Sequence, residues 1–387
     1  MKRAAAMGAM RPPRPRTERE AVDLGLELLV AGYEGDDLPD DYAELLGRGL
    51  AGAILFARNL RRTEGSGASA AIDVAALTAQ TAAIHAAGSA AGSLPTICSV
   101  DQEGGLVARL RRPFSHFPTM RDVADRGDLD LTRAVGWQTG AECLAAGFNL
   151  DFAPVLDIDT NPANPIIGRR AFGSDPETVI AHAEAFLDGL EAAGVRGCGK
   201  HFPGHGDTDT DSHLALPRLP FGIDRLREVE LRPFAALAGR LSMIMTAHVL
   251  FPALDPARPA TLSPAILRPL LRQHCGFGGV ICSDDLEMQG VAAAFSMTER
   301  IRFGLDAGVD LFLVCRVRAG LEEAMQEVAR ILLQDETRGG FALDAIARVR
   351  AFRAGLQRPE PSEAAVAAAL ASETSARLRI LFGLGTV

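Results

Sequence analysis

One short segment of the chain carries an unusual density of side chains that can exchange protons. Residues Lys200–His213 have the sequence KHFPGHGDTDTDSH, which holds three of the eight histidines and three aspartates. The small residues before it, Val195–Gly199, predict the end of a buried strand. The segment would then start at the C-terminal end of that strand, where α/β proteins keep their chemistry. Pro203, Gly204 and Gly206 predict an adaptable loop after the strand.

Two chemistries suit this segment. In the first, His201, His205 and His213 with one aspartate bind zinc or a similar cation, although their spacing does not match the usual compact motifs. In the second, Asp211 and His213 project on one side of an extended segment because they are two residues apart. The carboxylate would orient the imidazole, which gives and takes a proton near neutral pH. We favour the acid–base interpretation.

Polar side chains also follow several other apolar runs, each of which predicts a strand. Since the C-terminal ends of parallel strands meet at one face of a sheet or barrel, we expect these groups to converge there. They are Asp101, Arg109, Asp157, Arg169, Arg170, His248, Asp284 and Asp285.

Some of these positions have a structural explanation. His248 follows an apolar run and is expected to be a hydrogen-bonded core histidine rather than a reacting group. Asp285 is expected to cap the N-terminus of the following helix. Arg169 and Arg170 are adjacent, so their side chains should diverge and at most one should point inward.

The elements that must position these groups alternate regularly along the chain. Eight short Val/Ile/Leu-rich runs are separated by longer segments, several with helical periodicity, which predicts a parallel sheet closed into a (β/α)8 barrel. An open doubly wound sheet is the alternative, but its G-x-G-x-x-G fingerprint after the first strand is absent. The predicted strands are Gly25–Ala31, Ala51–Phe56, Pro95–Val100, Asn149–Val155, Val195–Lys200, Ser242–Ala247, Gly279–Ser283 and Val309–Val314.

The chain divides into three parts. Residues 1–20 are basic and rich in small residues, and we expect a disordered leader rather than a secretory signal. Residues 21–356 form the single barrel domain. Residues 357–387 form a C-terminal helical tail, in which Ser362–Leu381 is expected to be one alanine-rich helix packed on the outside of the barrel.

Composition limits the partners. The 387 residues carry a net charge of −9 and no long basic stripe after residue 20, which argues against nucleic acid and favours a small-molecule substrate. Six single cysteines without a C-x-x-C pair predict buried thiols in a reducing compartment. No window offers the roughly 18 apolar residues of a membrane helix. We therefore expect a cytoplasmic protein that does not bind membranes and acts as a monomer.

Five motifs together resemble a known family. The segment KHFPGHGDTxxDSH, with VDQEGG, DFAPVLD, GxRxFG and SDDLxM, is similar to the bacterial β-N-acetylhexosaminidases of glycoside hydrolase family 3. The resemblance extends from about Leu24 to Val314. It implies a (β/α)8 barrel that hydrolyses glycosides with retention of configuration, without a cofactor or metal. Many such enzymes remove terminal N-acetylglucosamine from peptidoglycan fragments during cell-wall recycling in the cytoplasm.

The resemblance also implies a role for each matching residue. Asp284, the first aspartate of SDDLEM, would be the nucleophile that forms a glycosyl ester. His213 would be the general acid and then the base, with Asp211 as its partner. The residues implied in binding the sugar are Asp101, Arg109, Arg170, Lys200 and His201. One carboxylate and one imidazole would thus divide the work that two carboxyl groups usually share.

Two departures and three alternatives accompany this assignment. Ala171 and Leu106 stand where the family commonly has serine and arginine, which bears on the preference for the leaving group rather than on the reaction. A histidine acid–base tolerates phosphate better than a carboxylate would, so a β-N-acetylglucosaminide phosphorylase is a close alternative. A metal-dependent hydrolase built on the histidines and a barrel that only binds sugars are the others.

Overall fold

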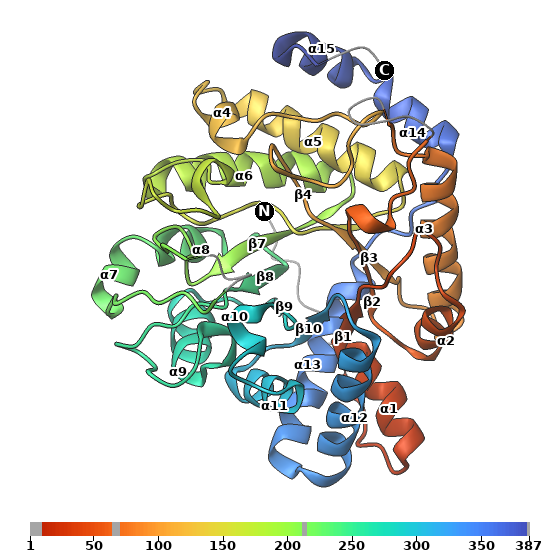
Figure 1. The fold of residues 1–387 in the computed structure, drawn as a ribbon, viewed down its shortest axis with the longest axis vertical. Coiled ribbons are helices and arrows are strands. Elements are labelled where there is room, and N and C mark those ends of the chain that lie inside the picture. The colour runs from red at the N-terminus through yellow and green to blue at the C-terminus, as the bar shows by residue number, and fades with distance from the viewer. Residues whose placement is uncertain (1–9, 64–69, 211–214, 385–387) are drawn as a thin grey trace.

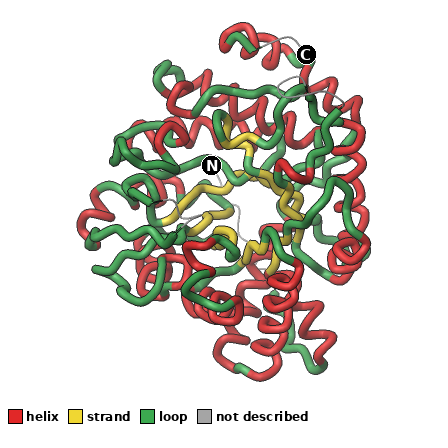
Figure 2. Tube along the Cα trace, viewed as in Figure 1, coloured by secondary structure: helices red, strands yellow, loops and turns green. Residues whose placement is uncertain are grey.

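The computed structural model describes residues 10–63, 70–210 and 215–384. In this part of the chain, eight parallel strands close into a barrel in the order β1-β10-β9-β8-β7-β6-β3-β2. The strands form the central ring in Figure 2, with helices around it. The (β/α)8 prediction is confirmed. The barrel strands are β1 (Leu29–Ala31), β2 (Gly52–Leu55), β3 (Ile97–Val100), β6 (Leu150–Asp151), β7 (Arg196–Phe202), β8 (Met243–Thr246), β9 (Val280–Asp285) and β10 (Leu311–Val314).

The strands are almost wholly buried, as expected when helices cover a parallel barrel. In β10 all four residues are buried, and in β9 only Asp284 is partly exposed. Six strands are shorter than predicted, and the difference is largest for β1 and β6. β1 begins at Leu29 because Leu26–Leu28 forms a 3-10 turn, and β6 ends at Asp151, shortly before Pro154, which has no N–H for a ladder bond.

Helices lie outside the barrel between successive strands (Figure 1). Several start at sequence signals: Asp175 caps α6, Pro176 is its first residue, and Ser296 forms a capping box with Glu299 in α11. The helices are α1 (Glu18–Gly25), α2 (Asp40–Arg48), α3 (Val74–Ser89), α4 (Met120–Ala124), α5 (Leu129–Ala145), α6 (Pro176–Ala192), α7 (Ile223–Glu228), α8 (Leu231–Leu237), α9 (Pro264–Ile266), α10 (Gln289–Ala292), α11 (Met297–Ala307), α12 (Arg318–Gln334), α13 (Glu336–Ala354), α14 (Glu363–Leu370) and α15 (Glu373–Phe382).

A small hairpin follows β3 that the sequence reasoning did not predict. It pairs β4 (Gln102–Gly104) with β5 (Val107–Ala108), and both Gly104 and Gly105 at its turn have positive φ. The Gln102 side chain fixes the hairpin by accepting from the Leu110 N–H and donating to the Leu110 carbonyl. The hairpin begins directly after Asp101, at the C-terminal end of the barrel.

The C-terminal tail differs from the single helix that was expected. It packs on the outside of the barrel against α5 and α3, but it contains the two helices α14 and α15. Ser372 separates them: its hydroxyl accepts from the Ser375 N–H as the N-cap of α15 and lies 2.9 Å from the Gln138 amide oxygen of α5. The chain therefore turns at Ser372, because this side chain both caps α15 and contacts α5.

The expected disordered leader is corrected for residues 10–20. Arg14 donates to the carbonyls of Leu332 and Asp335, where α12 meets α13, at 2.8 and 2.7 Å. Thr17 then forms a capping box with Glu20 at the start of α1. The carbonyl groups at the end of a helix lack intrahelical partners, so the side chains of an arginine-rich segment can bind there. Residues 1–9 lie outside the described residues.

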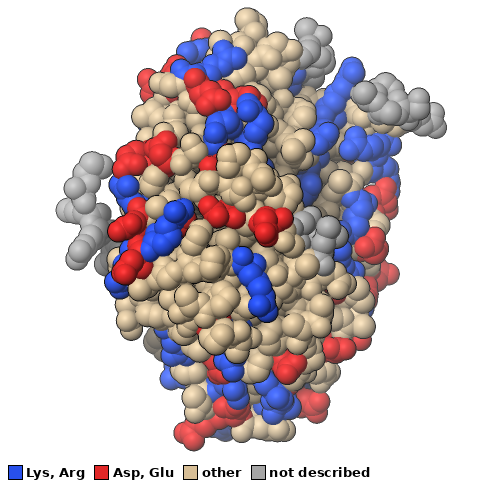
Figure 3. Space-filling view, turned by 60° about the vertical axis from the view of Figure 1, so that its left-hand side comes forward, with Lys and Arg blue, Asp and Glu red and all other residues tan. Residues whose placement is uncertain are grey.

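Burial and surface charge agree with the composition. All six cysteines are buried and free, as predicted. None of the helices in the described ranges is long and apolar enough to cross a membrane. On the face shown in Figure 3, basic and acidic side chains are interspersed and do not form one extended basic surface.

Close packing of α5 on α6 yields a first prediction. A Cβ at Gly189 would lie 2.0 Å from the Arg133 carbonyl oxygen and 2.6 Å from the Trp137 nitrogen, both backbone atoms of α5. Gly189→Ala should lower the free energy of unfolding by about 1–3 kcal/mol through overpacking. Gly239→Ala, where a Cβ meets nothing within 4 Å, is the control. Urea unfolding that shows equal stability for both variants would contradict this packing.

Candidate active site

A cavity of about 260 Å³ opens at the C-terminal ends of the barrel strands. Apolar side chains such as Ile54, Phe152 and Met245 line it together with charged groups. Every residue that has a role implied by the family motifs and lies within the described ranges lines this one cavity. These residues are Asp101, Arg109, Arg170, Lys200, His201 and Asp284. The other two, Asp211 and His213, lie outside the described residues.

Lys200 is the centre of an ion-pair network in the cavity wall. Its Nζ lies 2.9 Å from Asp101 Oδ1 and 2.6 Å from Glu103 Oε1, and the lysine is only 2% exposed. Arg170 binds both Glu103 oxygens at 2.8 Å, and Arg109 lies 3.6 Å from Asp101. The network links β7 to the hairpin after β3 and to the turn Gly168–Arg170.

Mutual neutralisation keeps these groups charged despite burial. For the Asp101 and Glu103 carboxyls, burial alone favours the protonated form, but the nearby cations Lys200, Arg109 and Arg170 hold both pKa values below the ordinary range. For Lys200, burial opposes the charge, yet the two carboxylates raise its pKa. The cavity wall is therefore a rigid array of charged donors and acceptors that can bind hydroxyl groups.

Asp157 organises the start of the histidine segment. Its Oδ2 lies 2.6 Å from His201 Nδ1, and its Oδ1 accepts from the His205 N–H at 2.7 Å. Burial raises the pKa of the Asp157 carboxyl, but the His201 imidazole outweighs this and the pKa is lowered. The second nitrogen of His201, Nε2, is the one left for a ligand in the cavity.

His205 is held as a structural residue. It is 2% exposed, and its Nδ1 lies 2.8 Å from the Thr208 hydroxyl. Burial and the neighbouring His201 lower its pKa to about 4, so the ring is neutral at physiological pH. Gly206 is packed so tightly that a Cβ would lie 1.8 Å from the Ile158 carbonyl oxygen. In this structure the loop predicted to be adaptable is held as far as Thr208 by contacts that no sequence motif reveals.

Asp284 is the partly exposed carboxylate at the end of β9. Its Oδ1 accepts from the Asp285 N–H at 2.8 Å, and the side chain lines the cavity. Asp285 is buried, and burial raises its pKa to about 6. Its Oδ1 accepts from the N–H groups of Glu287 and Cys315. It therefore joins β9 to the turn after β10 and does not cap α10, whose N-cap is Met288.

The structural expectations for His248 and the arginine pair are confirmed. His248 is fully buried, with Nδ1 2.9 Å from the Thr261 hydroxyl and Nε2 3.0 Å from the Asp285 carbonyl oxygen. Arg170 points inward to Glu103. Arg169 points away and pairs with Asp122 on α4.

Sequence reasoning gave neither Glu103 nor Asp157 a role in the site, although it placed Asp157 among the polar residues at the strand ends. Both were visible as acidic residues shortly after predicted strands, Glu103 within VDQEGG and Asp157 at the end of DFAPVLD. Their partners come from distant positions in the chain, so spacing alone could not assign them. Among the described residues, no group of three or more histidine, cysteine, aspartate or glutamate side chains is arranged to hold a metal ion.

Residues 30–338, which are most of the chain, match the sequence profile of the family described as "Glycosyl hydrolase family 3 N terminal domain". The chain belongs to glycoside hydrolase family 3. The resemblance drawn from the five motifs is thereby confirmed, and the protein is a glycosidase.

Individual relatives agree with this assignment. A β-hexosaminidase of Pseudomonas aeruginosa is 43% identical over 243 residues, which cover 62% of this chain and 73% of the relative. NagZ from Neisseria gonorrhoeae, solved in complex with N-trifluoroacetyl-D-glucosamine, is 31% identical with a TM-score of 0.71 and covers 92% of this chain and 97% of its own. A family 3 β-N-acetylglucosaminidase from Paenibacillus sp. str. FPU-7 is 32% identical with a TM-score of 0.77, covering 90% and 67% respectively.

A further carboxyl of this glycosidase lies near the ion-pair network. Asp151 ends β6 and is fully buried. Its Oδ1 accepts from the Gln102 N–H at 2.9 Å, and its Oδ2 has no hydrogen-bond partner in the described part of the chain. Burial raises its pKa from an ordinary 3.8 to about 8. The acid is therefore neutral in the folded enzyme at pH 7 and ionised in the unfolded chain.

This difference predicts how stability depends on pH. Between about pH 4 and 8 the folded state holds a proton on Asp151 that the unfolded state has lost, so stability falls as pH rises. The wild type should lose up to about 1.4 kcal/mol of unfolding free energy per pH unit relative to Asp151→Asn, and the difference should level off above pH 8. Urea unfolding of both proteins across pH 5–9 measures this. Parallel curves would show that Asp151 is ionised when folded.

Proposed function

We propose that this glycosidase is a retaining exo-β-N-acetylglucosaminidase. It would remove a terminal N-acetylglucosamine through a covalent ester on Asp284, with His213 and Asp211 as the acid–base pair. The observation that carries the proposal is the convergence of Asp284 with the Lys200 network on one small cavity. The hexosaminidase names of the relatives support the sugar and support water rather than phosphate as the acceptor.

The size and lining of the cavity favour a single terminal sugar. About 260 Å³ lies just below the range of roughly 300–1,000 Å³ typical of drug-sized ligands, which suits one sugar ring. The charged wall formed by Asp101, Lys200 and Arg109 can exchange hydrogen bonds with sugar hydroxyls, and apolar side chains can contact the ring faces. Oligosaccharide beyond the first ring would extend out of the barrel end.

Asp284 is suited to the role of nucleophile by its position. It is the partly exposed residue of β9, so one carboxylate oxygen can approach an anomeric carbon while Oδ1 is held by the Asp285 N–H. Asp285 cannot exchange places with it, because its own Oδ1 is occupied by two backbone N–H groups. Attack by Asp284 forms the C1–O ester bond as the bond to the leaving oxygen breaks.

The proton must come from a group other than His205. His205 is buried, neutral and bonded to Thr208, and His201 is bonded to Asp157 through one nitrogen. The family motif assigns the proton transfer to His213. It would protonate the leaving oxygen in the first step and remove a proton from water in the second, so that water releases the sugar from Asp284 with retained configuration.

The biological setting completes the proposal. Peptidoglycan fragments that end in N-acetylglucosamine are the expected substrates, as the resemblance implies. Six free, buried cysteines support a reducing compartment, which agrees with cell-wall recycling in the cytoplasm.

Replacement of Asp284 tests the nucleophile. Asp284→Ala should lower kcat at least about a thousandfold while N-acetylglucosamine still binds, because the ester cannot form. A 2-fluoro sugar with a good leaving group should label Asp284 in the wild type, as found by peptide mass spectrometry. The adjacent Asp285→Asn variant should still be labelled at Asp284. Label on any other residue would refute the assignment.

Replacement of His213 tests the acid–base role. His213→Ala should leave the first step intact for aryl glycosides with good leaving groups and slow release of the sugar, giving a burst of aglycone in stopped-flow measurements. Activity on substrates with poor leaving groups should be lost almost entirely. His274→Ala, which removes an exposed histidine on the outer surface, is the control. A His213→Ala enzyme with wild-type rates on both substrates would exclude this role.

A further inference from the structure

A second, larger pocket lies at the opposite end of the barrel from the active site. Its volume is about 880 Å³, within the range of small-molecule sites. It is bounded by residues 12–16, by α1, by the end of α2, by the connection Ala91–Leu94 before β3, and by α13. Because these connections enter the N-terminal ends of β2 and β3, the pocket is separated from Asp284 by the length of the barrel.

Arginines are prominent in this pocket. Five line it, Arg14, Arg16, Arg48, Arg350 and Arg353, against three carboxylates, Glu20, Asp23 and Glu27. Arg358 donates to the Ser93 carbonyl at its edge and adds another positive charge. An excess of cations here contrasts with the net charge of −9 for the whole chain.

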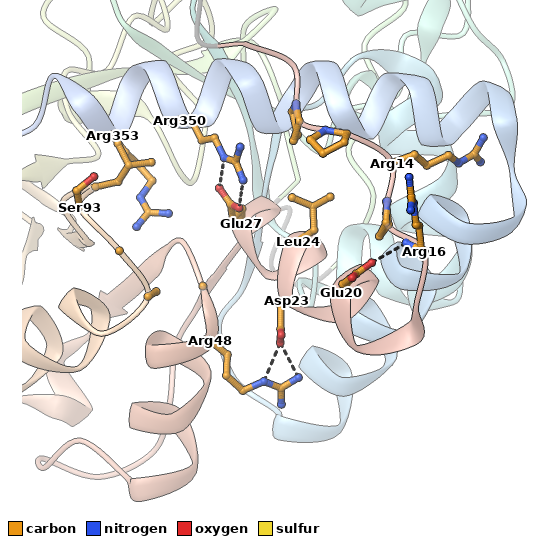
Figure 4. Close-up of a pocket in the computed structure, with 17 residues that line it drawn as sticks. Arg14, Arg16, Glu20, Asp23, Leu24, Glu27, Arg48, Ser93, Arg350 and Arg353 are labelled. Carbon is orange, nitrogen blue, oxygen red and sulfur yellow. Dashed lines mark hydrogen bonds and ion pairs between the residues drawn. The ribbon is translucent and has the colours of Figure 1, made fainter.

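Two of the carboxylates are already occupied by arginines. Both Glu27 oxygens bind Arg350, at 2.7 and 2.6 Å, and Asp23 binds Arg48 through two nitrogens at 2.9 Å. Figure 4 shows these two pairs on the wall of the pocket. The third, Glu20, accepts from backbone N–H groups in the capping box of α1. None of the three is left over for another cation.

Arg353 is the buried cation of this pocket that forms no ion pair with a carboxylate of the described residues. It is only 4% exposed, and its Nε donates to the Pro95 carbonyl at 2.9 Å. The carboxylate that acts on it most strongly is Glu27, whose two oxygens already bind Arg350. In Figure 4 its guanidinium extends from α13 into the same space as that of Arg350. Burial, together with repulsion from Arg350, lowers the pKa of Arg353 although Glu27 acts in the opposite direction.

The Nε of Arg353 is used by the Pro95 carbonyl, so its two terminal nitrogens remain to bind an anion that enters the pocket. The planar fork of a guanidinium matches the oxygens of a carboxylate or phosphate. Pro12, Pro13, Leu24 and Leu94 supply apolar surface beside it. We propose that this pocket is a binding site for a small organic anion, whose carboxylate or phosphate group binds Arg353 and whose body lies against the proline segment.

The test compares two substitutions at Ser93, an exposed residue on the pocket wall near Arg353. Ser93→Glu places a carboxylate beside the arginines, and Ser93→Gln has nearly the same size without the charge. Calorimetric titration with inorganic phosphate and with acetate, in separate arms, shows which oxyanion is preferred. Binding of either should be at least about tenfold weaker in Ser93→Glu than in the wild type, and unchanged in Ser93→Gln.

A second variant addresses Arg353 directly. Arg353→Met keeps the length of the side chain and should abolish binding of the preferred anion, with folding checked by thermal unfolding. Glycosidase turnover should be unchanged in both Ser93 variants, so the outcome is independent of the function proposed for the other end of the barrel. Absence of binding to the wild type up to about 10 mM of either anion, or equal binding by Ser93→Glu and Ser93→Gln, would overturn the proposal.

Discussion

The ion pairs of the buried Lys200 ammonium group with Asp101 and Glu103 are the interactions on which the candidate active site depends. A lysine that is almost fully enclosed can stay charged only if carboxylates surround it, and Asp101 and Glu103 do so at hydrogen-bond distance. Removing one partner from such a network typically costs about 3–5 kcal/mol, because the other charge is left buried. The network therefore fixes the hairpin after β3 and the turn that carries Arg170 against β7. The shape of the cavity at this end of the barrel follows from this electrostatic constraint.

The same physics separates residues that bind from residues that hold the binding residues in place. The Glu103 and Asp157 carboxylates bind cations, an imidazole and backbone N–H groups at this end of the barrel. Their charges are therefore neutralised by other parts of the protein. Asp284 differs, because one edge of its carboxylate is held by a backbone N–H and the rest faces the cavity. A barrel can keep one carboxylate accessible when its neighbours are neutralised by fixed partners. At the other end of the barrel, Arg353 binds a carbonyl oxygen but forms no ion pair among the described residues, and this contrast is the reason we infer a ligand there.

Much of the fold was predictable because it follows from local pattern. The eight apolar runs were each found as barrel strands, since parallel strands covered by helices are apolar on both faces. Capping signals are equally local, and Asp175-Pro176 coincides with the start of α6. The failures occurred where tertiary contacts override local preference. Ser372 divides the expected tail helix because it also contacts α5, and Arg14 orders a segment that its composition marked as a disordered leader.

The sequence by itself determined the barrel, the motifs that place the chain in its family, and the identity of the polar residues at the strand ends. Only the tertiary structure decided which of those residues are partners. Lys200 and Asp101 are about a hundred positions apart, and Arg353 and Pro95 still farther, so their contacts depend on the register and closure of the barrel. Local spacing specifies the side of a strand on which a side chain lies. The electrostatic field at that side chain is set by neighbours from distant parts of the chain. For this reason the charge state of Asp151 and the burial of Arg353 without an ion pair became visible only in the folded molecule.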